Sequence, residues 1–213
     1  MSRGSVRLLV FSASLRAGSL NTRLAELAAD VVEANDGEVD RASMAEFDCP
    51  SYNGDVQDRD GFPRGAEEMR RRLENCDGFV IASPEYNASM PGVLKNAIDW
   101  VSRFHPQPFN ERYGLLLSAS PSMVGGNRGV WALRVPFEHL GARVYPDMFS
   151  LAQAHNAFDG SGRIADPQLQ DRFTTNIVNF MDSVEAFKHY PCVKKAWFEY
   201  LGEHPEPAID RTQ

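Results

Sequence analysis

Hydroxyl, guanidinium and amide groups gather in a short loop near the start of the chain, at residues 12–21. The candidate donors are the hydroxyls of Ser14 and Ser19, the guanidinium of Arg16 and the amide of Asn21. Together with the unpaired N–H groups at the start of a following helix, they could bind one phosphate. The alternative is an ordinary polar turn in which Ser19 only caps that helix. The G-x-G-x-x-G fingerprint and the Walker lysine are absent, so the common dinucleotide and triphosphate sites are not indicated.

A second loop, at residues 84–92, reads Pro-Glu-Tyr-Asn-Ala-Ser-Met-Pro-Gly, and its prolines would hold it rigid. A flat heteroaromatic ring suits such a loop because successive backbone N–H groups can meet the polar edge of the ring. Tyr86 also offers a face for stacking. Taken alone, the loop fits a turn that caps the next helix equally well.

Short apolar runs that alternate with helix-like segments must position these loops. Strands are predicted at residues 6–11, 38–42, 78–83, 114–118 and 142–146, and helices at residues 20–34, 67–75, 91–101, 127–140 and 166–184. We expect a proline- and glycine-rich loop to lead from the second strand to residue 64. This order is typical of βαβ units, so the predicted fold class is α/β, an open, doubly wound sheet of five parallel strands with helices on both faces.

A third loop, at residues 118–128, follows the fourth predicted strand and reads Ser-Ala-Ser-Pro-Ser-Met-Val-Gly-Gly-Asn-Arg. It is again small, hydroxylated and glycine-rich, and it again precedes a helix. In a doubly wound sheet, the loops that follow the strands meet at one edge, where ligands bind. Three such loops therefore favour a ligand that carries both a phosphate and a ring.

The composition indicates a globular chain of one domain. The 213 residues are 43% hydrophobic, and 22 Lys and Arg against 29 Asp and Glu give a net charge of −7. Because this balance lacks the positive field of a nucleic-acid binder, we expect no nucleic acid and no membrane as partners. No apolar run reaches the length of a bilayer span or of a signal-peptide core. The cysteines and histidines are scattered, so we expect no metal site and a cytoplasmic location.

The three loops resemble those of the NADPH-dependent FMN reductase family, which has a flavodoxin-like fold and includes flavin, quinone, azo-dye and chromate reductases. The matching motifs are S-x-R-x-x-S-x-N, P-E-Y-N-x-S-x-P-G-x-L-K-N-x-x-D-W and S-A-S-P-x-x-x-G-G-x-R. The second is the most specific, and the resemblance covers roughly residues 6–185. It implies FMN as cofactor, NADPH or NADH as hydride donor, and a small-molecule electron acceptor.

The resemblance also implies a set of cofactor contacts. Carried over by position, the phosphate contacts fall on Ser14, Arg16, Ser19, Leu20 and Asn21. Those of the isoalloxazine fall on Pro84, Glu85, Tyr86 and Asn87, and those of its far side and the ribityl chain on Ser118, Ser120 and Gly125. Tyr52 and Asp55 are similar to the family's loop after the second strand. No side chain is expected to act as a base or nucleophile, because the flavin N5 carries the chemistry.

The end of the chain is rich in aromatic residues, so we expect a flavodoxin-like domain at residues 1–185 and an extension at residues 186–213. The apolar residues of the extension are Phe187, Tyr190, Val193, Trp197, Phe198 and Leu201. They could fold back on their own domain or pack on a neighbouring subunit. Since members of the family commonly form dimers or dimer pairs, the resemblance implies a homodimer or homotetramer.

Two other functions fit the same loops. One is an electron carrier of the flavodoxin type, which binds FMN and does not oxidise nicotinamide. Such a carrier would normally hold the phosphate through hydroxyls and backbone amides alone, so Arg16 favours the reductase. The other is a regulatory or scaffold protein that binds FMN, for which the acidic charge and the aromatic tail are the only indications.

Overall fold

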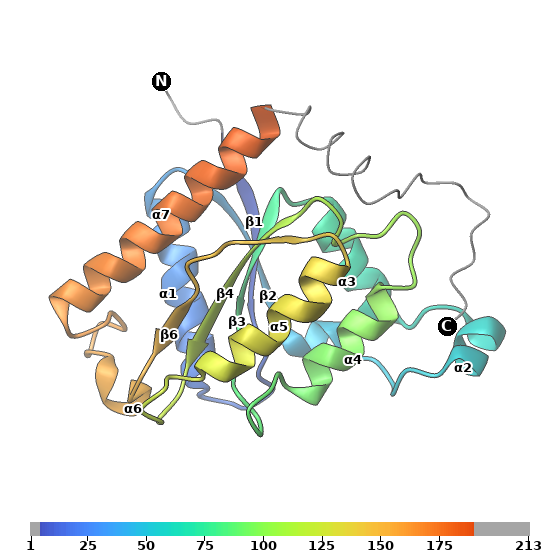
Figure 1. Ribbon diagram of the computed structural model, residues 1–213, viewed down its shortest axis with the longest axis horizontal. Coiled ribbons are helices and arrows are strands. Elements are labelled where there is room, and N and C mark those ends of the chain that lie inside the picture. Colours follow the sequence, from blue (N-terminus) through green and yellow to red (C-terminus); the bar gives the residue numbers. More distant parts are fainter. Residues whose placement is uncertain (1–4, 190–213) are drawn as a thin grey trace.

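A parallel β-sheet forms the centre of the computed structural model, which describes residues 5–189 (Figure 1). Its strands are β1 (Arg7–Ser12), β2 (Glu38–Ser43), β3 (Gly78–Ala82), β4 (Tyr113–Ala119), β5 (Arg143–Val144) and β6 (Phe149–Leu151). They lie in the order β2-β1-β3-β4-β5, and β6 pairs with β4. The chain reverses its direction of travel across the sheet between β1 and β3, so the crevice typical of this topology lies at the carboxyl ends of these two strands.

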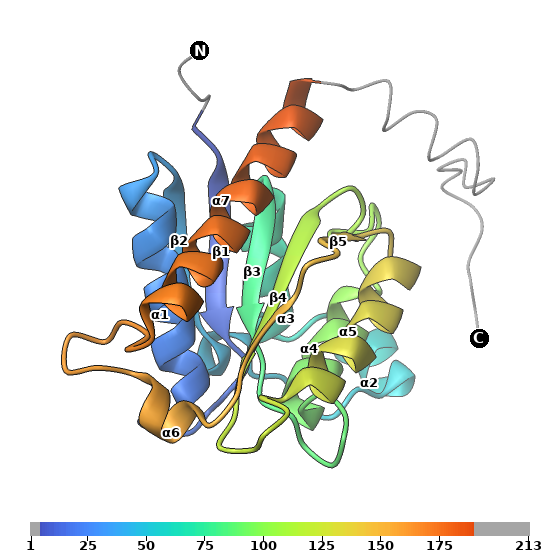
Figure 2. The ribbon, with the colours of Figure 1, turned by 60° about the vertical axis from the view of Figure 1, so that its left-hand side comes forward.

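Helices cover both faces of the sheet (Figure 2). One face carries α1 (Leu20–Ala34) and α7 (Pro167–His189), with α6 (Ala154–Ala157) near one end. The other carries α3 (Arg64–Glu74), α4 (Gly92–Val101) and α5 (Asn127–His139). The α/β class and the doubly wound parallel sheet predicted from the sequence are confirmed.

Side chains of each central strand alternate between two apolar cores, as a strand buried on both faces requires. In β1, Leu8 and Val10 pack in the core beneath α1 and α7. Leu9 and Phe11 pack in the core beneath α3 and α4. This double burial explains why β1 reads as an unbroken apolar run.

Two parts of the connection from β2 to β3 differ from the expected loop. A 3-10 helix (Met44–Phe47) follows β2 directly, and α2 (Gly54–Asp60) follows it. Helix α2 has no buried residue and is capped by Asn53, whose Oδ1 accepts the N–H of Asp55 at 2.9 Å. A helix without a buried face leaves no apolar periodicity in the sequence, so periodicity could not reveal it.

The far edge of the sheet also differs from the prediction. The strand predicted at residues 142–146 is limited to β5, and β6 continues the edge further along β4. Pro146 separates β5 from β6 because it lacks the N–H that a ladder of backbone hydrogen bonds needs.

The last described helix, α7, runs through the predicted boundary at residues 185 and 186. Phe187 is buried against Tyr113, with ring centroids 5.2 Å apart. The other apolar residues predicted to pack from the extension lie outside the described residues.

Candidate functional site

The three loops singled out from the sequence leave the carboxyl ends of neighbouring strands. The loop after β1 is bonded to β3, because the N–H of Ala13 donates to the carbonyl of Ala82 at 2.9 Å. The loop after β3 is bonded to β4 in the same way, from Ser83 to Leu117 at 2.8 Å. The sheet therefore extends into the first residues of these loops and brings them together at the switch point.

The loop before α1 presents unpaired donors. The side chain of Ser19 accepts the N–H of Asn21 at 3.2 Å and caps the helix. Within the described residues, the N–H groups of Leu20 and Thr22 in the first turn have no acceptor, and the exposed guanidinium of Arg16 has no ion pair. An unpaired cation beside free helix N–H groups is a donor set that fits the phosphate of FMN.

Asn21 is buried and already engaged. Its Nδ2 donates to the carbonyl of Ala119, and its Oδ1 accepts the N–H of the same residue, both at 2.9 Å. This pair of bonds fastens the first turn of α1 to the end of β4. In the described structure the amide therefore holds the loop before α1 in place, and its contact with a phosphate stays a prediction.

The loop after β3 forms a tight turn with its tip exposed. Tyr86 and Ser89 exchange backbone hydrogen bonds at 2.9 and 3.0 Å. Asn87 and Ala88 between them have φ of 52° and 62°, in the left-handed region. Tyr86 is 53% exposed, and the N–H groups at the tip have no acceptor within residues 5–189. These free N–H groups and the exposed ring fit the predicted contact with an isoalloxazine.

Pro84 and Glu85 begin this loop with little exposed surface. The Glu85 side chain is 9% exposed, and its carboxylate points to the start of α5 rather than to open solvent. Pro84 is half-buried and accepts a hydrogen bond from the Ser83 hydroxyl at 3.2 Å. The carboxylate of Glu85 is thus not free to meet a ligand in the described conformation.

The loop after β4 is shaped by close backbone packing. Ser118 is fully buried, its hydroxyl has no partner, and a Cβ on Gly126 would lie 2.0 Å from its Oγ. Gly125 has φ of 63°, and a Cβ there would lie 2.9 Å from the backbone of Ala152. Ser120 is half-buried and accepts the N–H of Ser122 at 3.2 Å. The structure thus gives Ser118 and Gly125 a packing role, and only Ser120 of the three has exposed surface.

The connection after β2 is fastened to α4 by a residue that the sequence reading missed. The Asn96 side chain accepts the N–H of Tyr52 at 2.9 Å and donates to the carbonyl of Pro50, also at 2.9 Å. The indole N–H of Trp100 donates to the same carbonyl at 2.7 Å. The place of this asparagine in the second motif, after L-K, was the available signal. Asp55 lies in the first turn of α2 and is exposed.

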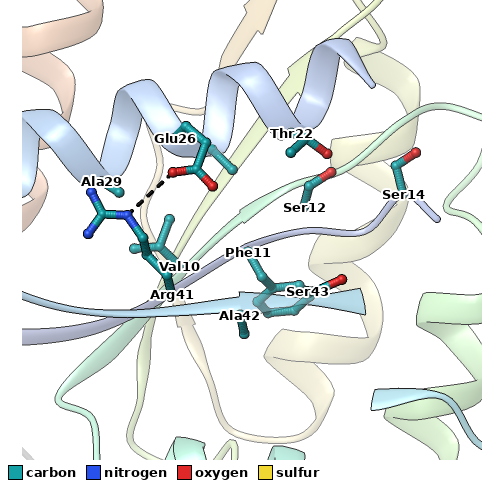
Figure 3. A pocket seen from close by; sticks show the side chains of 11 residues that line it. Val10, Phe11, Ser12, Ser14, Thr22, Glu26, Ala29, Arg41, Ala42 and Ser43 are labelled. Carbon is teal, nitrogen blue, oxygen red and sulfur yellow. Dashed lines mark hydrogen bonds and ion pairs between the residues drawn. The ribbon is translucent and has the colours of Figure 1, made fainter. Parts of the chain in front are cut away.

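A pocket that adjoins the first loop lies between α1, β1 and β2, with a volume of about 120 Å³ (Figure 3). Its polar lining includes the hydroxyls of Ser12, Ser14 and Thr22, and the Arg41–Glu26 ion pair lies further along it. Ser12 is buried and its hydroxyl has no partner. The volume is far below the 300 Å³ or more of a typical ligand pocket, so this cavity cannot hold the ring.

The thiols near the sheet are not nucleophiles. Burial raises the pKa of Cys49 and of Cys76 to about 11, so neither forms a thiolate at neutral pH. Over residues 5–189, no group of His, Cys, Asp and Glu could hold a metal ion. In the same range, no helix is long and apolar enough to cross a bilayer.

Comparisons with known proteins agree with this architecture. The family model for NADPH-dependent FMN reductase matches residues 6–156. The quinone reductase of Escherichia coli K12 is 32% identical over 185 residues, 86% of this chain and 97% of that protein. An NAD(P)H-dependent FMN reductase of Pseudomonas aeruginosa is 36% identical over 168 residues, 78% of this chain and 88% of that protein.

Solved structures show the same fold. FerB, a flavoenzyme NAD(P)H:(acceptor) oxidoreductase from Paracoccus denitrificans, aligns with a TM-score of 0.74 and 26% identity, covering 85% of this chain and 98% of that one. A flavodoxin from Bacillus cereus aligns with a TM-score of 0.54 and 10% identity, which shows the fold alone. The family match covers both the switch-point loops and the strands that carry them, and the chain therefore belongs to the NADPH-dependent FMN reductase family.

Proposed function

We propose that this enzyme transfers hydride from NADPH or NADH, through bound FMN, to a quinone. The observation that carries this proposal is the loop before α1, where an unpaired Arg16 lies beside helix N–H groups that have no acceptor in the described chain. Relatives named as quinone reductases support the choice of acceptor. FMN, when bound, supplies hydride acceptance and donation at its N5.

The chain's own residues bind and orient in this proposal. Arg16, Ser14 and the first N–H groups of α1 hold the phosphate. The exposed tip of the loop after β3 presents backbone N–H groups and the Tyr86 ring to the isoalloxazine. Since both described cysteines are protonated at neutral pH, they add no nucleophile.

The test is an anaerobic titration of the purified holoprotein. We expect bleaching of the flavin band near ~450 nm by NADPH or NADH, and its return when a benzoquinone is added. Comparing the two nucleotides at equal concentration gives the donor preference. If dithionite bleaches the band and neither nucleotide does, the protein is an electron carrier instead.

An assembly of two or four copies belongs to the same proposal. Large apolar side chains are exposed along α5 and the loop before it: Met123, Val124, Trp131 and Val135. Exposed apolar patches of this kind mark interfaces. Across a two-fold axis, the same patch of both subunits is buried in one interface. We expect light scattering to give a dimer or tetramer, and Trp131→Glu to reduce its mass.

The tail is tested separately. Deleting residues 190–213 removes none of the described residues of α7, so a loss of mass and of FMN retention would assign the tail to the interface. A truncated protein that keeps both would show that the tail has no part in assembly.

Unpaired Cys49 and Cys76 suit a reducing compartment, which supports the cytoplasmic location.

A further inference from the structure

We propose that Glu85 is a positioning residue, whose carboxylate clamps the start of α5 to the loop after β3 and so sets the spacing between the two loops on the ring side of the site. The inference rests on the proposed cofactor site. It assigns to Glu85 no contact with the flavin and no proton transfer.

The first observation is that α5 lacks a cap of its own. Its N-cap residue is Gly126, which has φ of 85° and offers no side-chain bond. The first N–H groups of a helix have no partner within the helix. Glu85 Oε2 accepts the N–H of Arg128 at 3.0 Å, and at 3.4 Å it shares the N–H of Gly129 with the carbonyl of Gly126, which lies at 3.1 Å. A carboxylate from another loop, 43 residues earlier in the chain, therefore caps α5 and faces the positive end of its dipole.

The second observation is that the carboxylate has no bonding capacity to spare. Its Oε1 accepts from Nε of Arg128 at 2.9 Å and pairs with Nη2 at 2.6 Å. The Glu85 side chain is 9% exposed, whereas that of Arg128 is 63% exposed. Both oxygens are directed at α5 and shielded from water, so the carboxylate holds the two segments together and is not available for chemistry.

The third observation is backbone contact where the clamp closes. A Cβ on Gly129 would lie 3.1 Å from Glu85 Cα and 3.2 Å from the carbonyl oxygen of Ser89. The helix therefore rests directly on both ends of the turn that carries Tyr86. Any shift of α5 away from this turn changes the position of its exposed tip relative to the loop after β4.

Three variants separate positioning from chemistry. Glu85→Gln keeps the shape of the side chain but replaces one carboxylate oxygen with an NH₂ group. This new donor then faces an N–H group of α5 that needs an acceptor. Glu85→Asp keeps the charge but is too short to reach α5. Gly129→Ala leaves Glu85 intact and pushes the helix away from the turn. Gly160→Ala is the matched control, because a Cβ there meets nothing within 4 Å.

The first readout is FMN affinity, measured by quenching of flavin fluorescence. We expect all three variants to take up FMN with a Kd raised about three- to thirtyfold, since small misplacements are costly at a preorganised site. Gly160→Ala should match the parent. At saturating FMN, single-turnover reduction by nicotinamide should keep the pH profile of the parent, because the carboxylate transfers no proton.

The second readout uses the protein without FMN. We expect faster amide hydrogen exchange at residues 85–89 and 127–130 in all three variants, because the clamp no longer ties these segments together. Unchanged exchange would overturn the inference whatever the cofactor does. If the exchange changes as expected but the parent protein binds no FMN, the proposed function fails and the clamp stands.

Two further results would also overturn the inference. Glu85→Gln could bind FMN as the parent does, yet lose reduction with a shifted pH profile that Glu85→Asp restores; the carboxylate would then transfer a proton. Alternatively, Gly129→Ala and Glu85→Gln could both leave the Kd unchanged, in which case the spacing of these loops does not matter for the cofactor.

Discussion

Replacing Arg16 with Ala tests the phosphate loop most directly. In the described chain the guanidinium has no partner and is exposed, so its removal takes no contact from the FMN-free protein. Exposed substitutions of this kind change the free energy of unfolding by less than ~0.5 kcal/mol. A hydrogen bond to a charged group contributes about 1.5–3 kcal/mol. The Kd for FMN should therefore rise roughly 10- to 150-fold.

Titration calorimetry with two ligands isolates the phosphate. Riboflavin has the ring and the ribityl chain but no phosphate, so its Kd should be the same for Arg16→Ala and the parent. Arg16→Lys keeps the charge without the planar fork, and it should fall between the two for FMN. Raising the salt concentration should shrink the difference, because an exposed cation is screened. Equal weakening for FMN and riboflavin would refute the reasoning, as would a large loss of stability in the FMN-free variant.

Three smaller predictions follow from single side chains. Tyr86→Ala should raise the Kd for FMN about fivefold, because a stacking face contributes on the order of 1 kcal/mol, whereas Tyr86→Phe should match the parent in the same titration. Ala88 has φ of 62°, a conformation that costs an L-residue ~1–2 kcal/mol. Ala88→Gly removes this strain, although the larger entropy of glycine in the unfolded chain offsets ~0.5–1 kcal/mol of the stabilisation. The variant should therefore unfold at a higher urea concentration than the parent without FMN, and a destabilised variant would contradict the strain argument. Hydrogen bonds from Arg71 and Arg72 lower the pKa of Glu68 to about 2. This value is below the unfolded ~4.3, so the stabilisation is present above that pH and is lost as the pH falls towards 2. Solvent screening limits the effect to ~1 kcal/mol or less, and urea midpoints at pH 6 and pH 3 should differ less in Glu68→Gln than in the parent.

The local pattern of the sequence determined the elements and the loops. Apolar runs predicted β1, β3 and β4 to within one residue at each end, because strands buried on both faces carry unbroken apolar segments. The edge strand β2, which has no buried residue, was predicted equally closely from its place in the alternating order of elements. Ser, Arg, Asn, Pro and Gly at the strand ends predicted the site-bearing loops, since these residue types suit turns and anion contacts. These features depend on a few consecutive residues, so they can be read without the fold.

Only the tertiary structure decided which way the polar side chains point and what they bind. The sequence predicted cofactor contacts for Asn21 and Glu85, and the fold adds a partner 98 residues away for Asn21 and one 43 residues away for Glu85. Ser118 became a buried hydroxyl beneath Gly126 for the same reason. A hydrogen-bond donor or acceptor is known from its residue type, but its partner depends on which segments the strand order brings side by side. Long-range pairing of this kind leaves no periodic mark in the sequence, and it appears only when the sheet is assembled.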